Sequence, residues 1–168
     1  MALKSKALVN VEAKQTRSQD LSSDTGSLVK SYGTTFADGT GAGQADAVFS
    51  DQRTLAASAN ETLDLAGTLA GTFGNVSFAR VKAIIVKAAD GNTNDVLVGG
   101  GTNALSTWVA DATDIVRLRP GATLCLVAGS ADATGYAVTG GTGDLLRVAN
   151  SGAGSTVTYD VIVIGASA

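Results

Sequence analysis

Short segments in which apolar and polar residues alternate recur from residue 47 to the end of this 168-residue chain. Alternation with period two places one set of side chains on each face of an extended strand. Leu63 and Leu65, for example, are separated by the polar Asp64. No segment of comparable length combines a 3.6-residue period with the capping residues of a helix. The pattern therefore predicts an all-β protein.

About eight to ten short strands, separated by turn residues, are typical of a β-sandwich or jelly roll. The longest predicted strand changes phase between Phe78 and Val81, which indicates a β-bulge near Arg80. Residues 90–95 are predicted to form the turn that pairs this strand with the next one. The predicted strands are residues 47–55, 61–67, 76–89, 95–101, 104–109, 114–120, 123–128, 135–139, 144–150 and 156–165.

The alternation also predicts which side chains fill the space between two sheets. They are Val81, Ile85, Val116, Leu118, Leu124, Leu126, Leu146, Val148, Val161 and Val163. The single cysteine, Cys125, is interpreted as a buried small apolar side chain because it lies within one of these strands.

Two strands are apolar on both faces, with Val127, Ile162 and Ile164 opposite the predicted core. A sandwich covers only one face of each sheet. We therefore expect a homo-oligomer, with a trimer favoured, in which these side chains lie near a subunit contact or under the arm of a neighbour. The alternative is that loops or the arm of the same chain cover this face.

Residues 1–46 form a different segment, which is predicted to be an extended N-terminal arm with a Gly-rich loop. Large apolar residues are few in it, so ordering it alone buries too little apolar area to offset the lost entropy. We therefore expect the arm to lie on a neighbouring subunit, and residues 47–168 to form the sandwich. Apolar residues of the arm predicted to make contacts are Leu3, Leu8, Val9, Val11, Leu28, Tyr32 and Phe36.

The composition argues against several classes of function. The chain has no histidine, so histidine-dependent nucleophiles and the common zinc sites are absent, and neither an enzyme activity nor a cofactor is predicted. Its net charge of −3 argues against a nucleic-acid partner, which requires a basic surface. No run of apolar residues is long enough to predict a membrane span.

Several motifs have a chemical and a structural interpretation. Residues 90–95 resemble the start of a calcium loop, but Asp95 occupies the position of its required glycine, so a turn is favoured. The Gly-rich segments 39–43 and 140–143 lack the strand-loop-helix context of phosphate loops and are interpreted as tight turns.

Asp111 and Asp114 flank a turn, and nothing in the sequence defines a catalytic carboxylate pair. Three aromatic residues suggest either a carbohydrate-binding platform or core packing, namely Trp108, Tyr136 and Tyr159.

Two stretches resemble a family of small tailed-bacteriophage and prophage virion structural proteins. They are Asp38-Gly-Thr-Gly-Ala and Ala149-Asn-Ser-Gly-Ala-Gly, within a likeness over residues 28–168. The resemblance implies a virion component and supplies no catalytic residues.

A head decoration or cement protein is therefore the preferred function. Its expected partners are the major capsid protein or other virion proteins, and its expected location is the outer surface of the head after synthesis in the bacterial cytoplasm. A tail, baseplate or fibre-attachment protein is the alternative, and a carbohydrate-binding module is a further one.

Overall fold

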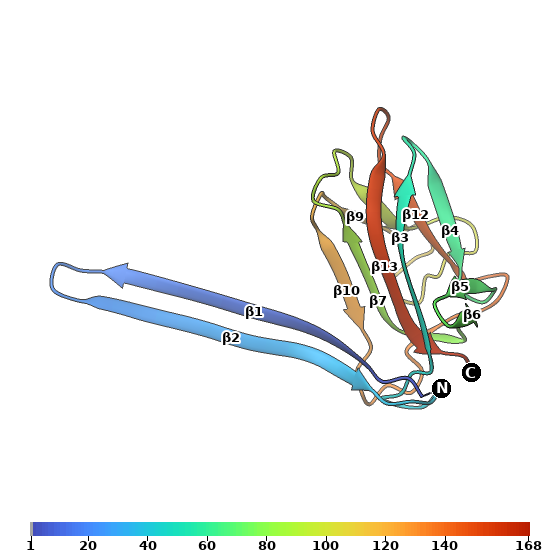
Figure 1. The fold of residues 1–168 in the computed structure, drawn as a ribbon, viewed down its shortest axis with the longest axis horizontal. Coiled ribbons are helices and arrows are strands. Elements are labelled where there is room, and N and C mark those ends of the chain that lie inside the picture. The colour runs from blue at the N-terminus through green and yellow to red at the C-terminus, as the bar shows by residue number, and fades with distance from the viewer. Residues whose placement is uncertain (1) are drawn as a thin grey trace.

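The computed structural model describes residues 2–168 as two packed antiparallel β-sheets and a long N-terminal β-hairpin (Figure 1). The described residues contain no helix, which confirms the all-β class and the extended arm. The strands are β1 (Ser5–Ser18), β2 (Ser23–Phe36), β3 (Ala47–Leu55), β4 (Asn60–Asp64), β5 (Leu69–Gly71), β6 (Gly74–Val76), β7 (Arg80–Ala88), β8 (Val96–Gly99), β9 (Ile115–Leu118), β10 (Thr123–Val127), β11 (Tyr136–Ala137), β12 (Leu145–Asn150) and β13 (Val157–Ala166).

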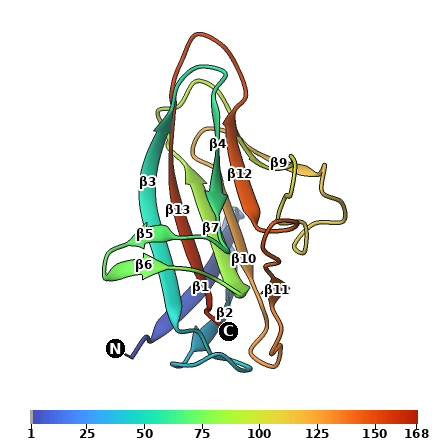
Figure 2. The same ribbon diagram turned by 90° about the vertical axis from the view of Figure 1, so that its right-hand side faces the viewer.

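The sandwich consists of a five-stranded and a four-stranded sheet. The first has the order β10-β7-β13-β3, with β11 also pairing with β7, and the second has the order β4-β12-β8-β9. Figure 2 shows the two layers nearly edge-on, with the small β5-β6 hairpin beside β3. All strand pairs are antiparallel, so each sheet presents alternate side chains to the space between the layers.

The main core lies between these sheets, and most of the side chains predicted for it are there. Six of them are buried: Val81, Leu118, Leu146, Val148, Val161 and Val163. Val116, Leu124 and Leu126 are half-buried against the same core because β9 and β10 lie at sheet edges. Ile85 was predicted wrongly, since it packs on the outer face of the five-stranded sheet.

The reason for that error is the β-bulge in β7. The pairing with β13 shifts so that Ile164 is opposite Ala83 whereas Gly165 is opposite Val81, which leaves Lys82 as the extra residue. The bulge therefore lies two residues beyond its predicted position near Arg80. After the bulge, the inward positions are Ile84 and Val86 in place of Ile85.

Lys82, the bulge residue, is buried, and its Nζ donates hydrogen bonds to the carbonyl oxygens of Asp132 (2.9 Å) and Ala133 (2.6 Å). Burial lowers the pKa of Lys82 below its ordinary value of 10.5, although the charge of Asp132 partly opposes this effect. Between the lowered and the ordinary value, the unfolded chain holds more protons than the folded one. The free energy of unfolding should therefore rise with pH through this window.

We expect this rise in urea denaturation curves measured up to about pH 10, the limit at which tyrosines begin to titrate. Lys82→Met should lack the rise, because methionine has no group that titrates in this range. An equal pH dependence in both proteins would show that Lys82 is not its source.

Three strand predictions are corrected by the structure. Residues 76–89 do not form one strand, because Val76 belongs to the β5-β6 hairpin and β7 starts at Arg80. Strand β8 does not pair back with β7. It crosses to the other sheet, where it lies between β12 and β9. Residues 104–109 form turns in place of a strand, and Trp108 packs on the core there.

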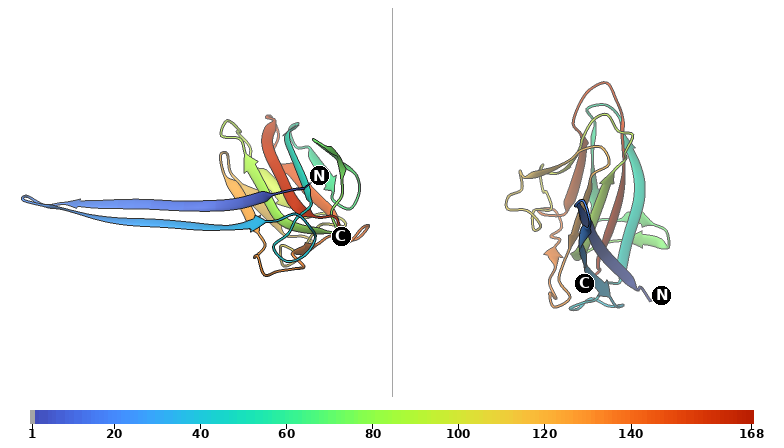
Figure 3. Two further views of the ribbon diagram at one scale, coloured as in Figure 1. Left: turned by 60° about the horizontal axis from the view of Figure 1, so that its bottom comes forward. Right: turned by 90° about the vertical axis from the view of Figure 1, so that its left-hand side faces the viewer.

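The arm is a hairpin of two 14-residue strands, β1 and β2, which pair with each other along their whole length. Figure 3 shows that it projects far from the sandwich. This self-pairing differs from the predicted arm, which was expected to lie on a neighbouring subunit. Each strand of the hairpin forms backbone hydrogen bonds with the other along one edge, and most side chains of both strands are exposed. The arm is therefore ordered by backbone pairing and not by burial of apolar side chains, which is why its low apolar content did not prevent a β-structure.

Candidate interaction surface

The pairing register divides the hairpin into two chemically different faces. Residues directly opposite each other in an antiparallel pair project from the same face. One face carries the pairs Val9–Tyr32, Val11–Lys30 and Ala13–Leu28. We call Val9, Val11, Ala13, Leu28 and Tyr32 the apolar hairpin face. The opposite face is more polar, with Lys6, Asn10, Glu12 and Lys14 from β1 and only Leu8 and Val29 as large apolar residues.

The base of the hairpin is fixed to the sandwich by a second, smaller core. Phe36 and Ala7 are buried there against Ala83 and Ile164 on the outer face of the five-stranded sheet. Thr34, on the same side of the hairpin, donates a hydrogen bond from Oγ1 to the carbonyl oxygen of Ala128 (3.2 Å). The apolar hairpin face is therefore the continuation, beyond the edge of the sandwich, of the face that packs on it.

The residues predicted to make contacts separate into two groups. Phe36 and Ile164 are buried in the second core, and Leu3 and Val127 are half-buried against it. These four residues join the arm to its own sandwich, which is the alternative cover that the sequence analysis left open. Six others are exposed: Leu8, Val9, Val11, Leu28, Tyr32 and Ile162. Four of the six belong to the apolar hairpin face, whereas Leu8 lies on the polar face beside Gly33.

The outer face of the five-stranded sheet consists of rows of side chains that run across its strands. The first row, Val48, Ile164, Ala83 and Val127, is under the hairpin base, and we call it the covered row. The next row, Ser50, Ile162, Ile85 and Cys125, is the open row. A groove of roughly 420 Å³ follows part of the open row and is bounded on one side by residues 6–9 of β1. Cys125 lines this groove on the outer face of the sheet and is half-buried, so it is not the fully buried side chain that the sequence predicted.

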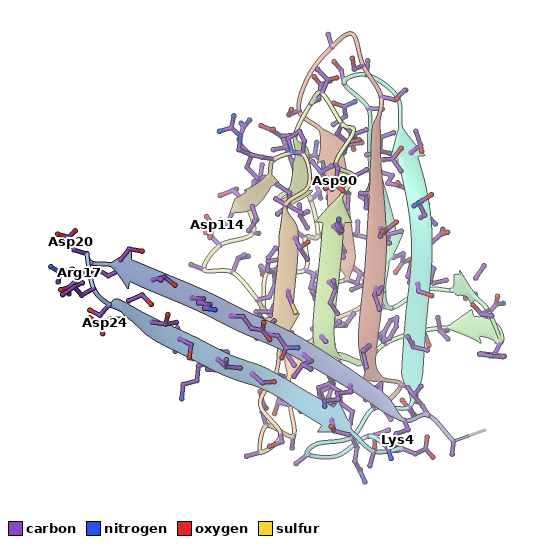
Figure 4. All side chains as sticks on the ribbon, turned by 60° about the vertical axis from the view of Figure 1, so that its left-hand side comes forward. Lys4, Arg17, Asp20, Asp24, Asp90 and Asp114 are labelled. Atoms are coloured by element: carbon purple, nitrogen blue, oxygen red, sulfur yellow. The ribbon has the colours of Figure 1, made fainter. Side chains whose placement is uncertain are left out.

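The N-terminal segment that includes the hairpin is also the cationic part of the chain. Residues 1–36 contain five Lys and Arg against three Asp and Glu (net +2), whereas residues 37–168 contain seven against twelve (net −5). Within residues 2–168, the salt bridges involve Arg53, Lys87 and Arg117 of the sandwich and no cation of the hairpin. Figure 4 shows the hairpin crossing in front of the five-stranded sheet, with Arg17, Asp20 and Asp24 at its far end.

Sequence reasoning missed Ala7 as an anchor and Ile85 and Cys125 as groove residues. Leu21 at the hairpin tip and Val29 on the polar face are apolar residues of the arm that were not among the predicted contacts, and both are exposed. Only the register of β1 and β2 reveals which apolar residues share a face, because the alternation alone does not show where the chain turns back.

The polar residues of the predicted motifs in the sandwich form hydrogen bonds that stabilise its turns and loops. Asn92 exchanges two hydrogen bonds with the backbone of Thr158, both 2.8 Å long. Asp111 accepts hydrogen bonds from the backbone N–H and hydroxyl of Thr113, which lower its pKa. Asp114 caps the same turn through the N–H groups of Ala110 and Asp111. In the described part of the chain, no group of three or more Cys, Asp or Glu residues is arranged to hold a metal ion.

The aromatic residues considered for carbohydrate binding pack on the main core. Tyr159 is fully buried, and its hydroxyl donates a hydrogen bond to Oε1 of Glu61 (2.8 Å). Burial, and then this hydrogen bond, raise the pKa of Tyr159 well above its ordinary value. Trp108 and Tyr136 are half-buried, and the indole N–H of Trp108 donates to the carbonyl oxygen of Leu105 (2.8 Å). Tyr159 is therefore not accessible to a sugar ring.

Comparisons with known proteins supply no family. No protein-family model matches the sequence, and neither does any curated protein. A search of solved structures found a likeness to IMPa from Pseudomonas aeruginosa in complex with an O-glycopeptide, with 17% identity and a TM-score of 0.35. The match covers 72% of this chain and 13% of that one. A likeness at this TM-score carries no argument about fold or function.

No helix long and apolar enough to cross a membrane is found in residues 2–168.

Proposed function

We propose that this chain is a non-enzymatic structural subunit of a bacteriophage virion, a decoration protein that binds the major capsid protein on the outside of the head. The observation that carries the proposal is the hairpin. Its two 14-residue strands project from a sandwich and pair with none of its strands. A folded domain with such an extension is suited to holding neighbouring subunits in a shell.

The chemistry of the hairpin supports binding to another protein. A two-stranded ribbon is marginally stable alone in water and needs packing against a further strand or surface. Beyond the second core, nothing in residues 2–168 covers the apolar hairpin face, and each strand leaves one edge of its backbone N–H and C=O groups without a strand partner there. A partner surface can cover the apolar face, and a partner strand can form hydrogen bonds with an unpaired edge.

Copy number tests the location in the particle. Quantitative mass spectrometry of purified particles of the encoding phage or prophage should find the chain in hundreds of copies, as a head lattice requires. Roughly three, six or twelve copies would instead assign it to a tail or vertex. Absence of the chain from the particles would overturn the virion proposal.

Shortening the hairpin tests whether it is the anchor. Residues 10–31 are removed and Val9 is joined to its partner Tyr32 through an Asn-Gly turn, which keeps Ala7 and Phe36 in the second core. The variant should melt like the wild type but should lose at least about tenfold in affinity for particles that lack the protein. Co-sedimentation measures the binding, and saturation at wild-type concentrations would show that the anchor is elsewhere.

A further inference from the structure

The open row and the apolar hairpin face are two uncovered apolar surfaces of one molecule, and they adjoin each other. Residues 6–9 of β1 form one wall of the groove, and Ile85, Cys125 and Ile162 line the sheet side. Ile162 is 36% exposed, and Val9, Val11 and Leu28 are 39–47% exposed. Both surfaces are also continuous with the second core, where the same sheet face and the same hairpin face are already in contact.

The two surfaces match in length. The open row spans four strands, from β10 to β3, so its three strand spacings cover about 14 Å. From Val9 to Ala13, the apolar hairpin face rises by four residues, also about 14 Å. The base of the hairpin already crosses the sheet strands in this direction over the covered row (Figure 4). A second hairpin lying alongside it would occupy the open row.

The charges match as well. Lys30 lies in the middle of the apolar hairpin face, opposite Val11, and makes no salt bridge within residues 2–168. Next to the open row on β13 is Asp160, which accepts a hydrogen bond from Gln52 (2.8 Å) but has no ion pair there. The cation on the other side of Asp160, Lys87, is paired with Asp90. The net charges of +2 for residues 1–36 and −5 for residues 37–168 extend this complementarity to the whole molecule.

We propose that the occupant of the open row is the hairpin of a second copy of this chain. The apolar hairpin face of one copy packs on Ile162, Ile85 and Cys125 of the next, beside that copy's own β1, and places Lys30 near Asp160. The contact is head-to-tail, because the two surfaces involved are different. Repetition of such a contact produces a closed ring if the rotation between copies closes, and a chain of subunits if it does not.

Three single substitutions test this arrangement. Leu28→Lys impairs the apolar hairpin face, and Ile162→Lys impairs the open row. Val29→Lys is the matched control, because Val29 is adjacent to Leu28 but lies on the other face, opposite Glu12. The wild type and the control should associate in light-scattering and native mass measurements, and each of the other variants alone should dissociate with a constant raised about tenfold or more.

A mixture of the two impaired variants identifies the head-to-tail contact. Leu28→Lys retains an intact open row and Ile162→Lys retains an intact hairpin, so the mixture should form a one-to-one heterodimer and no larger species. If Ile162→Lys alone associates like the wild type, the hairpins pair with each other and the proposal is wrong. A monomeric wild type, or equal loss of association in Val29→Lys, would overturn it too.

Cys125 provides a readout that needs no substitution. Because it lines the groove, the rate of its modification by a maleimide should fall as the wild-type concentration rises, and should stay constant for Ile162→Lys. A rate independent of wild-type concentration across the range in which association occurs would contradict docking at the open row. The experiments distinguish failure of this inference from failure of the proposed function. A monomeric chain that is present in particles would overturn this inference and leave the virion role standing.

Discussion

Phe49→Ala is expected to lower the free energy of unfolding by about 3–5 kcal/mol, among the largest effects for a single side chain. Phe49 lies on β3, is 1% exposed and projects into the main core between the two sheets. Its removal loses apolar burial and also leaves a cavity, because the ladder between β3 and β13 fixes the backbone around it. Urea denaturation followed by far-ultraviolet circular dichroism measures the loss.

Phe73→Ala is the matched control, since Phe73 is 80% exposed and lies outside that core. It should change the free energy of unfolding by no more than about 0.5 kcal/mol. Similar losses in the two variants would mean that the sandwich is not packed as described.

Phe36→Ala is expected to release the hairpin without unfolding the sandwich. Phe36 is fully buried in the second core, where it is the largest side chain that the hairpin contributes. Truncating a buried phenylalanine costs about 3–5 kcal/mol, which is more than a two-stranded ribbon of marginal stability is able to lose. Backbone amides of β1 and β2 should therefore exchange with solvent much faster than in the wild type, whereas amides of β7 and β13 should keep their protection.

Hydrogen exchange followed by mass spectrometry, at a dilution where the chain is monomeric, measures this difference. Tyr32→Ala is the control. Tyr32 is on the same strand and the same face as Phe36, but it is 63% exposed and lies beyond the contact with the sandwich. Unchanged protection of the hairpin in Phe36→Ala would show that other contacts hold the hairpin on the sheet.

The alternation of residues was sufficient to predict the class of fold and the inward side of strands that lack irregularities. Val161 and Val163 alternate without interruption along β13, and both are buried. Ile85 was misplaced because one extra residue, Lys82, reverses the alternation within β7. Where such a bulge lies depends on the pairing with β13, which is a property of two segments about eighty residues apart and not of β7 alone.

The candidate surface shows the same division. Composition indicated that residues 1–46 form a separate arm, and the alternation of residues indicated that Ile162 and Ile164 lie opposite the core. Local chemistry did not distinguish these two isoleucines. Tertiary structure did, because Phe36 packs on Ile164 and leaves Ile162 in the open row. Likewise, Val9, Val11, Leu28 and Tyr32 share one face of the hairpin only through the register of β1 with β2. A period-two pattern reflects the backbone geometry of a single strand. Which strand it pairs with, in which register, and what covers each face of the sheet depend on residues that are distant in sequence.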